Sequence, residues 1–190
     1  MNLIIFDLDG TLVKLPIDYE ALRHRLYLTF DNRIVLGSIY RFLIHLDPKS
    51  REKAFRIMDK FELESIPQMY IDPTIHEGFR LIRDYTKALV TLQGWRPVIK
   101  ILEEIGIRKE FSMIVTREYS LNRTEQLMYV LDRLNADRKR TVFIGDTQND
   151  LEAAKIIGIF PIIMGSKIDG NQIKDILSAI RIAISRLEKQ

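Results

Sequence analysis

The chain has 190 residues, of which 46% are hydrophobic and 29% charged, a composition typical of a globular protein that can bury a sizeable core. It contains no cysteine, which excludes a disulfide scaffold, a thiol nucleophile, a cysteine-ligated zinc site and an iron–sulfur cluster. Its 29 basic and 26 acidic residues give a net charge of only +3 and are spread along the chain, so the charge gives no reason to expect nucleic-acid binding.

Short apolar runs predict the buried strands of a parallel sheet, because a strand covered on both faces is apolar at every position. Helical periodicities lie between them, and those over 95–105 and 149–157 are closed by Gly106 and Gly158. Strands that alternate with helices predict a doubly wound α/β fold with right-handed crossovers. The expected strands are 3–6, 88–90, 111–115, 142–144 and 159–163, and the expected helices of this part are 75–85, 95–105, 123–134, 149–157 and 172–187.

One region breaks the alternation. From Leu12 to about Arg80 the sequence has no clear strand, but it has helical patterns over 19–30, 33–46 and 48–63. Asp47-Pro48 is a start signal for the last of these, a capping acid followed by proline at the first helical position. The region is too long for a connection, so we predict an all-helical cap at 14–74, inserted after the first strand of a core formed by 1–13 and 75–190.

Two acidic clusters follow predicted strands. Asp7 and Asp9 come after the first strand, and Asp146 and Asp150 come after the fourth. Either cluster alone is also typical of ordinary turn and helix-capping residues. Ligands of open α/β sheets bind beyond the carboxyl ends of the strands, where the two clusters would meet if these strands are neighbours.

Such a meeting of carboxylates has an energetic cost. At about 4 Å and an effective dielectric constant of about 20, each like-charged pair costs roughly 4 kcal/mol. A divalent cation removes this repulsion. Aspartate side chains and a backbone carbonyl favour a hard ion, and Mg²⁺ is the expected one where a phosphate supplies further oxygens.

With these motifs the sequence resembles the haloacid dehalogenase-like hydrolase superfamily, in particular its phosphoglycolate-phosphatase-like members with a small helical cap. Asp7-Leu8-Asp9-Gly10-Thr11 matches the first motif of that family, DxDGT, and Gly145-Asp146 through Asp150 matches the fourth, GDxxxD. The resemblance covers nearly the whole chain. It implies a sheet with the strand order 5-4-1-2-3, in which the first and fourth strands are neighbours.

The resemblance also implies roles for the acidic residues. Asp7 would be the nucleophile that forms an aspartyl-phosphate, and Asp9 the general acid and then the general base. Asp7 and Asp146 would bind Mg²⁺ together with the Asp9 carbonyl, and Asp150 would support the site directly or through water.

The phosphate-binding motifs match less closely. The family's third motif is a lysine, but the stretch 116–124 contains none, so Arg123 is the candidate for this cation and Arg117 the fallback. Thr91 ends the second strand, with Leu92 where the family often has asparagine. The residues expected to contact the phosphoryl group are Gly10, Thr11, Thr91, Leu92 and Arg123.

We therefore predict a Mg²⁺-dependent phosphatase that acts on a small phosphorylated metabolite. The presence of Asp9 favours phosphoryl chemistry over carbon–halogen cleavage, because a departing halide needs no proton. A phosphomutase on the same scaffold, a phospho-acceptor signalling module and a phosphate-binding or regulatory protein without turnover are the alternatives. The D-x-D spacing and the large helical insertion speak against the signalling module, which needs neither a second acid nor a lid.

The N-terminal segment reaches Asp7 before any long apolar run, so it resembles neither a signal peptide nor a transit sequence. The longest uncharged apolar stretch, 156–165, is about half of the roughly 20 residues that span a bilayer. We expect a soluble, cytoplasmic monomer or homodimer that binds no membrane.

Overall fold

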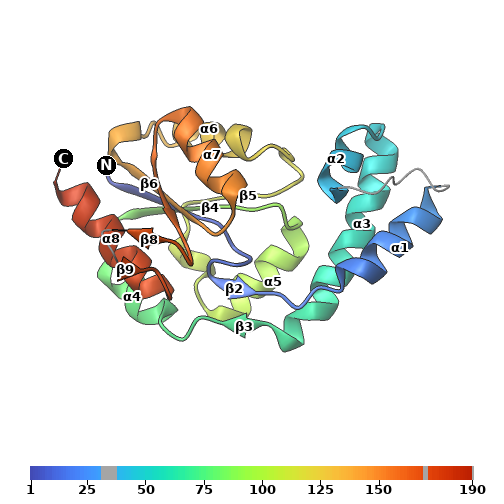
Figure 1. The fold of residues 1–190 in the computed structure, drawn as a ribbon, viewed down its shortest axis with the longest axis horizontal. Coiled ribbons are helices and arrows are strands. Elements are labelled where there is room, and N and C mark those ends of the chain that lie inside the picture. The colour runs from blue at the N-terminus through green and yellow to red at the C-terminus, as the bar shows by residue number, and fades with distance from the viewer. Residues whose placement is uncertain (31–37, 169–170, 190) are drawn as a thin grey trace.

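The computed structural model describes residues 1–30, 38–168 and 171–189. Its centre is a parallel sheet of five strands in the order β5-β4-β1-β6-β7, with helices on both faces (Figure 1). This confirms the predicted fold class and strand order, and it makes β1 and β6 neighbours. The strands are β1 (Leu3–Phe6), β4 (Thr86–Val90), β5 (Met113–Val115), β6 (Thr141–Gly145) and β7 (Phe160–Ile163).

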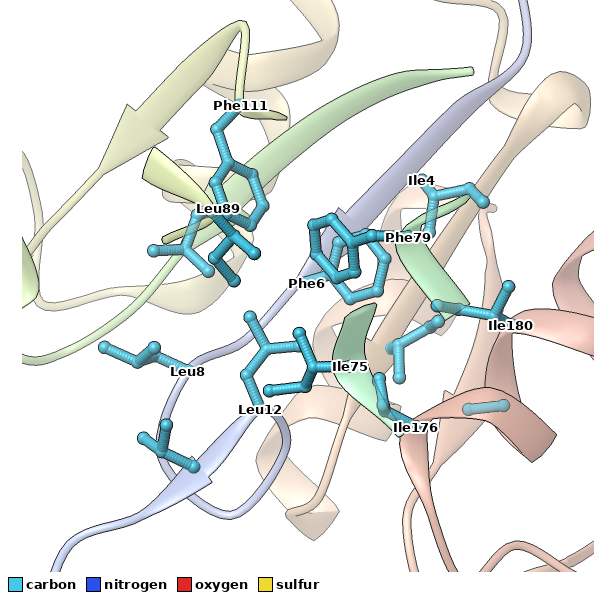
Figure 2. Packing of buried hydrophobic residues seen from close by; sticks show 14 of the residues in the cluster. Ile4, Phe6, Leu8, Leu12, Ile75, Phe79, Leu89, Phe111, Ile176 and Ile180 are labelled. Atoms are coloured by element: carbon cyan, nitrogen blue, oxygen red, sulfur yellow. The ribbon is translucent and has the colours of Figure 1, made fainter. Parts of the chain in front are cut away.

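Strand β1 is the middle of the sheet, and all four of its residues are fully buried. Ile4 and Phe6 face one apolar layer, which Phe79 and Phe111 complete, and the rings of Phe6 and Phe79 stack with centroids 5.3 Å apart (Figure 2). Leu3 and Ile5 face the layer on the other side. The first layer is covered by α4 (Ile75–Leu81), α5 (Trp95–Ile105) and α8 (Ile176–Glu188), and the second by α6 (Arg123–Arg133) and α7 (Gln148–Ile157).

Two predicted helices have different ends in the structure. Helix α4 ends at Leu81 rather than at Tyr85. Beyond its end, the carbonyls of Ile82 and Tyr85 accept hydrogen bonds from Nζ of the buried Lys87 at 2.8 and 3.1 Å. Helix α8 begins at Ile176 rather than near 172, since the Asp175 carboxylate caps it by accepting from the Ser178 amide at 2.7 Å. The short hairpin β8 (Lys167–Ile168) and β9 (Asn171–Gln172) precedes this cap.

Among the described residues, the three α-helices that follow β1 in the chain lie beside the sheet (Figure 1). They are α1 (Tyr19–Thr29), α2 (Ile39–Ile44) and α3 (Pro48–Ser65), and they share an apolar cluster that contains Leu22, Leu26, Leu43 and Met58. The Asp47 carboxylate caps α3 as predicted, accepting from the Lys49 and Ser50 amides. Of the helix predicted at 33–46, the part at 33–37 lies outside the described residues.

The region also contains strands that the sequence analysis did not expect. Strand β2 (Val13–Lys14) pairs antiparallel with β3 (Tyr70–Ile71), where the chain leaves the sheet and returns to it. Two-residue strands are too short to leave a periodic pattern in the sequence. The described residues also form the 3₁₀ turns η1 (Ile66–Gln68), η2 (Arg108–Glu110) and η3 (Arg138–Arg140).

Within the part of the chain that the structure describes, no helix has both the length and the apolar character needed to cross a bilayer.

Candidate active site

The two acidic clusters meet at the carboxyl ends of β1 and β6. Phe6 is paired with Ile144 in the parallel register, and the Asp7 amide continues the ladder by donating to the Ile144 carbonyl at 2.8 Å. Carboxylate oxygens of Asp7, Asp146 and Asp150 consequently all lie within 4.8 Å of one another. The close approach that the sequence analysis required for a metal site is present.

A tight turn after β1 makes room for this cluster. Gly10 has a φ of +84°, and its amide donates to the Val13 carbonyl at 2.7 Å. A β-carbon on Gly10 would lie only 2.1 Å from Oδ2 of Asp146. Glycine is thus required both by the left-handed backbone conformation and by the carboxylate beside it. The following Thr11 is buried, and its hydroxyl has no hydrogen-bond partner.

Arg123 lies between two of the acids. It is the first residue of α6, its side chain is 6% exposed, and its Nη2 donates to Oδ1 of Asp7 at 2.9 Å. Its Nε lies 2.8 Å from Oδ1 of Asp150. Arg117, the fallback candidate, instead pairs with Asp59 and Glu62 of α3. The structure therefore brings Arg123 to the acidic cluster.

Asp150 both caps helix α7 and contacts the site. Its Oδ2 accepts from the Thr147 hydroxyl at 2.7 Å and from the Thr147 amide at 3.1 Å, which completes the capping box visible in the sequence. Its Oδ1 faces Arg123. Asp150 therefore takes part in the capping box of α7 and also contacts Arg123 beside the acidic cluster.

Asp9 lies at the edge of the cluster and lines the cavity above it. Its Oδ1 accepts from the Leu15 amide at 2.8 Å, and its Oδ2 accepts from Nε2 of Gln93 at 3.4 Å. Gln93 is connected in turn to the end of β4, because the Thr91 hydroxyl donates to its Oε1. Thr91 is fully buried behind Leu92 and Gln93, which line the cavity.

The cavity has a volume of about 540 Å³ and reaches from the acidic cluster to α1 and α2. The wall also contains residues that we did not select from the sequence, among them Gln93, Tyr19, Ser38, Tyr40, Thr147 and Asn149. Gln93 offered a signal, a polar residue just beyond a strand end. Thr147 and Asn149 lie inside the GDxxxD motif, of which only the acids were selected. Tyr19, Ser38 and Tyr40 carried no signal, since tyrosine and serine are common on polar surfaces. The described lining residues are Asp7, Asp9, Tyr19, Ser38, Tyr40, Leu92, Gln93, Leu121, Arg123, Asp146, Thr147 and Asn149.

Burial changes the protonation of the site. It raises the pKa of Asp7 to about 8, against the opposing effect of Arg123, and Asp150 and Asp146 raise it further. It raises the pKa of Asp146 to about 6, with a contribution from Asp150. Burial also raises the pKa of Asp9 and brings that of the Tyr40 hydroxyl to about 12.

The acidic cluster fits a hard divalent cation. Its donors are carboxylate oxygens, and Oδ1 of Asp146 is buried with no hydrogen-bond partner. Asp7 and Asp146 are the acids that would hold the ion, since both oxygens of Asp150 already face Thr147 or Arg123.

A family model described as haloacid dehalogenase-like hydrolase matches residues 4–164, which include both acidic clusters and the segment between them. The chain belongs to this family. The resemblance seen in the sequence is confirmed, and with it the class of the protein, a hydrolase.

Three proteins illustrate the relationship. A probable phosphatase of Dickeya dadantii is 27% identical, with 83% of this chain and 78% of that protein covered. The structure of a predicted phosphoglycolate phosphatase from Haemophilus somnus has a TM-score of 0.68 at 20% identity and covers 96% of this chain and 97% of that one. That of a putative β-phosphoglucomutase from Thermotoga maritima has a TM-score of 0.63 at 19% identity and covers 100% and 99%. At these identities the two structures share the fold with this haloacid dehalogenase-like hydrolase.

The first prediction concerns Gly10. In Gly10→Ala the new methyl group would displace the Asp146 carboxylate, so we expect Mg²⁺ to lose its stabilising effect on thermal unfolding. Gly106→Ala is the matched control, because Gly106 has nearly the same φ, +82°, and no atom within 4 Å of the added carbon. Equal Mg²⁺-induced shifts of Tm in the two variants would contradict the placement of the metal beside Gly10.

The second prediction is a pH dependence. The folded-state pKa of Asp7, about 8, lies above its usual value of 3.8, so the folded protein binds more protons than the unfolded chain between these values. The metal-free protein should therefore lose stability as the pH rises from 6 to 8. Mg²⁺ bound at this cluster would have to displace these protons, so its stabilising effect should grow over the same interval.

The measurement is Tm at pH 6, 7 and 8 with EDTA and with Mg²⁺. In Asp7→Asn the side chain at position 7 cannot ionise, so the Tm of the metal-free variant should depend much less on pH. A metal-free Tm that rises with pH across this range would show that Asp7 is ionised in the metal-free protein.

Proposed function

We propose that the chain is a Mg²⁺-dependent phosphatase that hydrolyses a small phosphorylated metabolite through an aspartyl-phosphate on Asp7. The contact of Arg123 with Asp7, beside Asp146 and at the base of the cavity, carries the proposal. The cavity volume of about 540 Å³ is in the range of small-molecule sites.

Asp7 supplies the attacking oxygen. Its Oδ1 is held by Arg123, which fixes the carboxylate and places a permanent positive charge beside the phosphoryl oxygens. Asp7 and Asp146, with the Asp9 carbonyl, would hold Mg²⁺, which when bound favours the ionised form of Asp7 and neutralises phosphoryl charge. Attack forms the bond from Asp7 to phosphorus and breaks the bond from phosphorus to the leaving oxygen.

Asp9 moves the protons. Burial raises its pKa, which favours the protonated form that gives a proton to the leaving oxygen. The resulting carboxylate then takes a proton from the water that attacks phosphorus. This attack breaks the bond between Asp7 and phosphorus, releases inorganic phosphate and regenerates the Asp7 carboxylate. The Leu15 amide and Gln93 hold both oxygens of Asp9, so the carboxyl group keeps one orientation through the two steps.

The phosphoryl oxygens would be bound by the turn after β1 and the loop after β4. Gly10 and Thr11 belong to the turn, and the unpartnered Thr11 hydroxyl is a free donor there. Leu92 lies on the cavity wall, with Thr91 directly behind it.

Residues 14–74 would act as the cap of this enzyme. The α1–α3 helices share their own apolar cluster, and Tyr19, Ser38 and Tyr40 from this region line the cavity. Closure over the cavity would exclude water during the first step and select the substrate. A cytoplasmic location and a monomer or homodimer complete the proposal.

The decisive assay uses p-nitrophenyl phosphate, with and without Mg²⁺. Wild type should hydrolyse it only with the metal, and Asp7→Asn should lose at least about a thousandfold in kcat, because removal of a nucleophile abolishes the covalent route. Asp84→Asn, at an exposed aspartate, is the control and should match wild type. Full metal-dependent turnover by Asp7→Asn would contradict the mechanism.

The same assay separates the alternatives. A phosphomutase would release little phosphate from any monoester and would instead move the phosphoryl group between two hydroxyls of a sugar phosphate. No turnover of any monoester, with phosphate still bound, would favour a protein that binds phosphate without catalysis.

A further inference from the structure

Arg117 is the largest of the fully buried side chains, and the mechanism above does not use it. It follows β5 and reaches helix α3, where its guanidinium forms ion pairs with Asp59 and Glu62. Nη2 of Arg117 also donates to the second oxygen of Glu62 at 3.0 Å. A core arginine is thus paired with two acids of one cap helix.

This ion-pair cluster is also bonded to the loop after β4. Nη1 of Arg117 donates to the Leu92 carbonyl at 3.1 Å, and the Arg117 amide donates to the Gln93 carbonyl at 3.3 Å. Glu62 accepts from the Gly94 amide at 3.1 Å. Three consecutive residues of the loop are therefore held from one side. The Arg117 guanidinium holds Leu92, the Arg117 backbone amide holds Gln93, and the Glu62 carboxylate holds Gly94.

The fit of the loop against the cluster is close. A β-carbon on Gly94 would lie 2.0 Å from Oδ1 of Asp59 and 2.6 Å from Nη2 of Arg117. The backbone at Gly94 therefore lies directly against the charged groups, with no room for a side chain. A shift of α3 or of Arg117 must move the loop.

The other side of the loop faces the acidic cluster. Leu92 and Gln93 line the cavity, and Gln93 donates to Asp9. A path of direct contacts thus runs from Glu62 on the cap helix, through Gly94 and Gln93, to the proposed general acid.

Stability alone gives little reason for such a cluster. Desolvation of buried charges offsets much of their attraction, and apolar side chains of similar volume often stabilise a core equally well. Buried ionic groups are best known for fixing one arrangement of packed elements. The side chain of Arg117 contacts helix α3 and the loop after β4, the two elements whose relative position it would fix.

We propose that Arg117 and Glu62 are positioning residues that fix the loop 91–94, and with it Gln93 and Asp9, relative to cap helix α3. The proposal rests on the proposed function for its kinetic consequence. Loss of the pair would leave the acidic cluster and Arg123 intact but would allow Gln93 to move away from Asp9.

The test is the double variant Arg117→Met/Glu62→Met, which removes both members of the more deeply buried ion pair. It leaves the carboxylate of Asp59, whose side chain is 15% exposed, without its cation. We expect it to fold, to lose about tenfold or more in kcat for p-nitrophenyl phosphate, and to keep KM within about threefold. Hydrogen exchange of the Gly94 amide should accelerate by about tenfold or more, because its acceptor Glu62 is gone.

Lys87→Met is the matched control. Lys87 is also a buried cation that donates to backbone carbonyls, but it lies at the opposite end of β4 from the loop. It should lower Tm without changing kcat or the exchange of the Gly94 amide.

If the double variant does not fold, Glu62→Gln serves in its place, since it keeps the volume and an acceptor for Gly94 while removing the charge. A partial loss of kcat and a smaller rise in exchange are expected. A folded variant of either kind with wild-type kcat and wild-type exchange of the Gly94 amide would overturn the proposal. If wild type hydrolyses no monoester, the proposed function fails, and the exchange measurement still decides whether the pair fixes the loop.

Discussion

Repulsion among Asp7, Asp146 and Asp150 is the constraint on which the site depends. Their oxygens lie within 4.8 Å of one another, and Arg123 supplies one positive charge for the three acids. Burial and mutual repulsion together raise the pKa of Asp7 to about 8, so the metal-free site is unfavourable when fully ionised. A bound divalent cation would relieve the repulsion among the three carboxylates. The cluster therefore has the chemistry of a metal site whose protein ligands are carboxylates. The three carboxylates can approach one another because β1 and β6 are neighbouring strands and because Gly10 has no side chain that would displace Asp146.

The second group of buried charges lies between the sheet and α3, where Arg117 meets Asp59 and Glu62. Arg123 and Arg117 contact different parts of the site. Arg123 contacts the acids at the strand ends, while Arg117 contacts the loop that forms the next part of the cavity wall. In the proposed enzyme the first would act on the phosphoryl group and the second on the placement of the loop. Arg117 lies between β5 and α6, and Arg123 is the first residue of α6, so this short stretch of chain contacts both helix α3 and the acidic cluster.

Much of the sheet and of the acidic cluster could be predicted from the sequence, because strands buried on both faces and motifs at their ends leave strong local patterns. The strand order came with the family resemblance, and the selection of Arg123 over Arg117 agreed with the side-chain geometry. Gln93 was missed because its contact with Asp9 joins residues 84 positions apart. The pairing of Arg117 with α3 was missed for the same reason, and β2 and β3 because two residues show no period. Contacts between side chains that are far apart in the sequence and outside any motif can be identified only once the fold is known.

The central claim is that Asp7 carries the phosphoryl group. The most direct measurement mixes enzyme, Mg²⁺ and a turned-over phosphate ester, quenches the mixture in acid within the first turnover and locates the phosphoryl group by peptide mass spectrometry. We expect the added mass on the peptide that contains Asp7, dependent on Mg²⁺ and absent from Asp7→Asn. Phosphoryl mass on a different residue, or rapid turnover during which the Asp7 peptide is never modified, would contradict it.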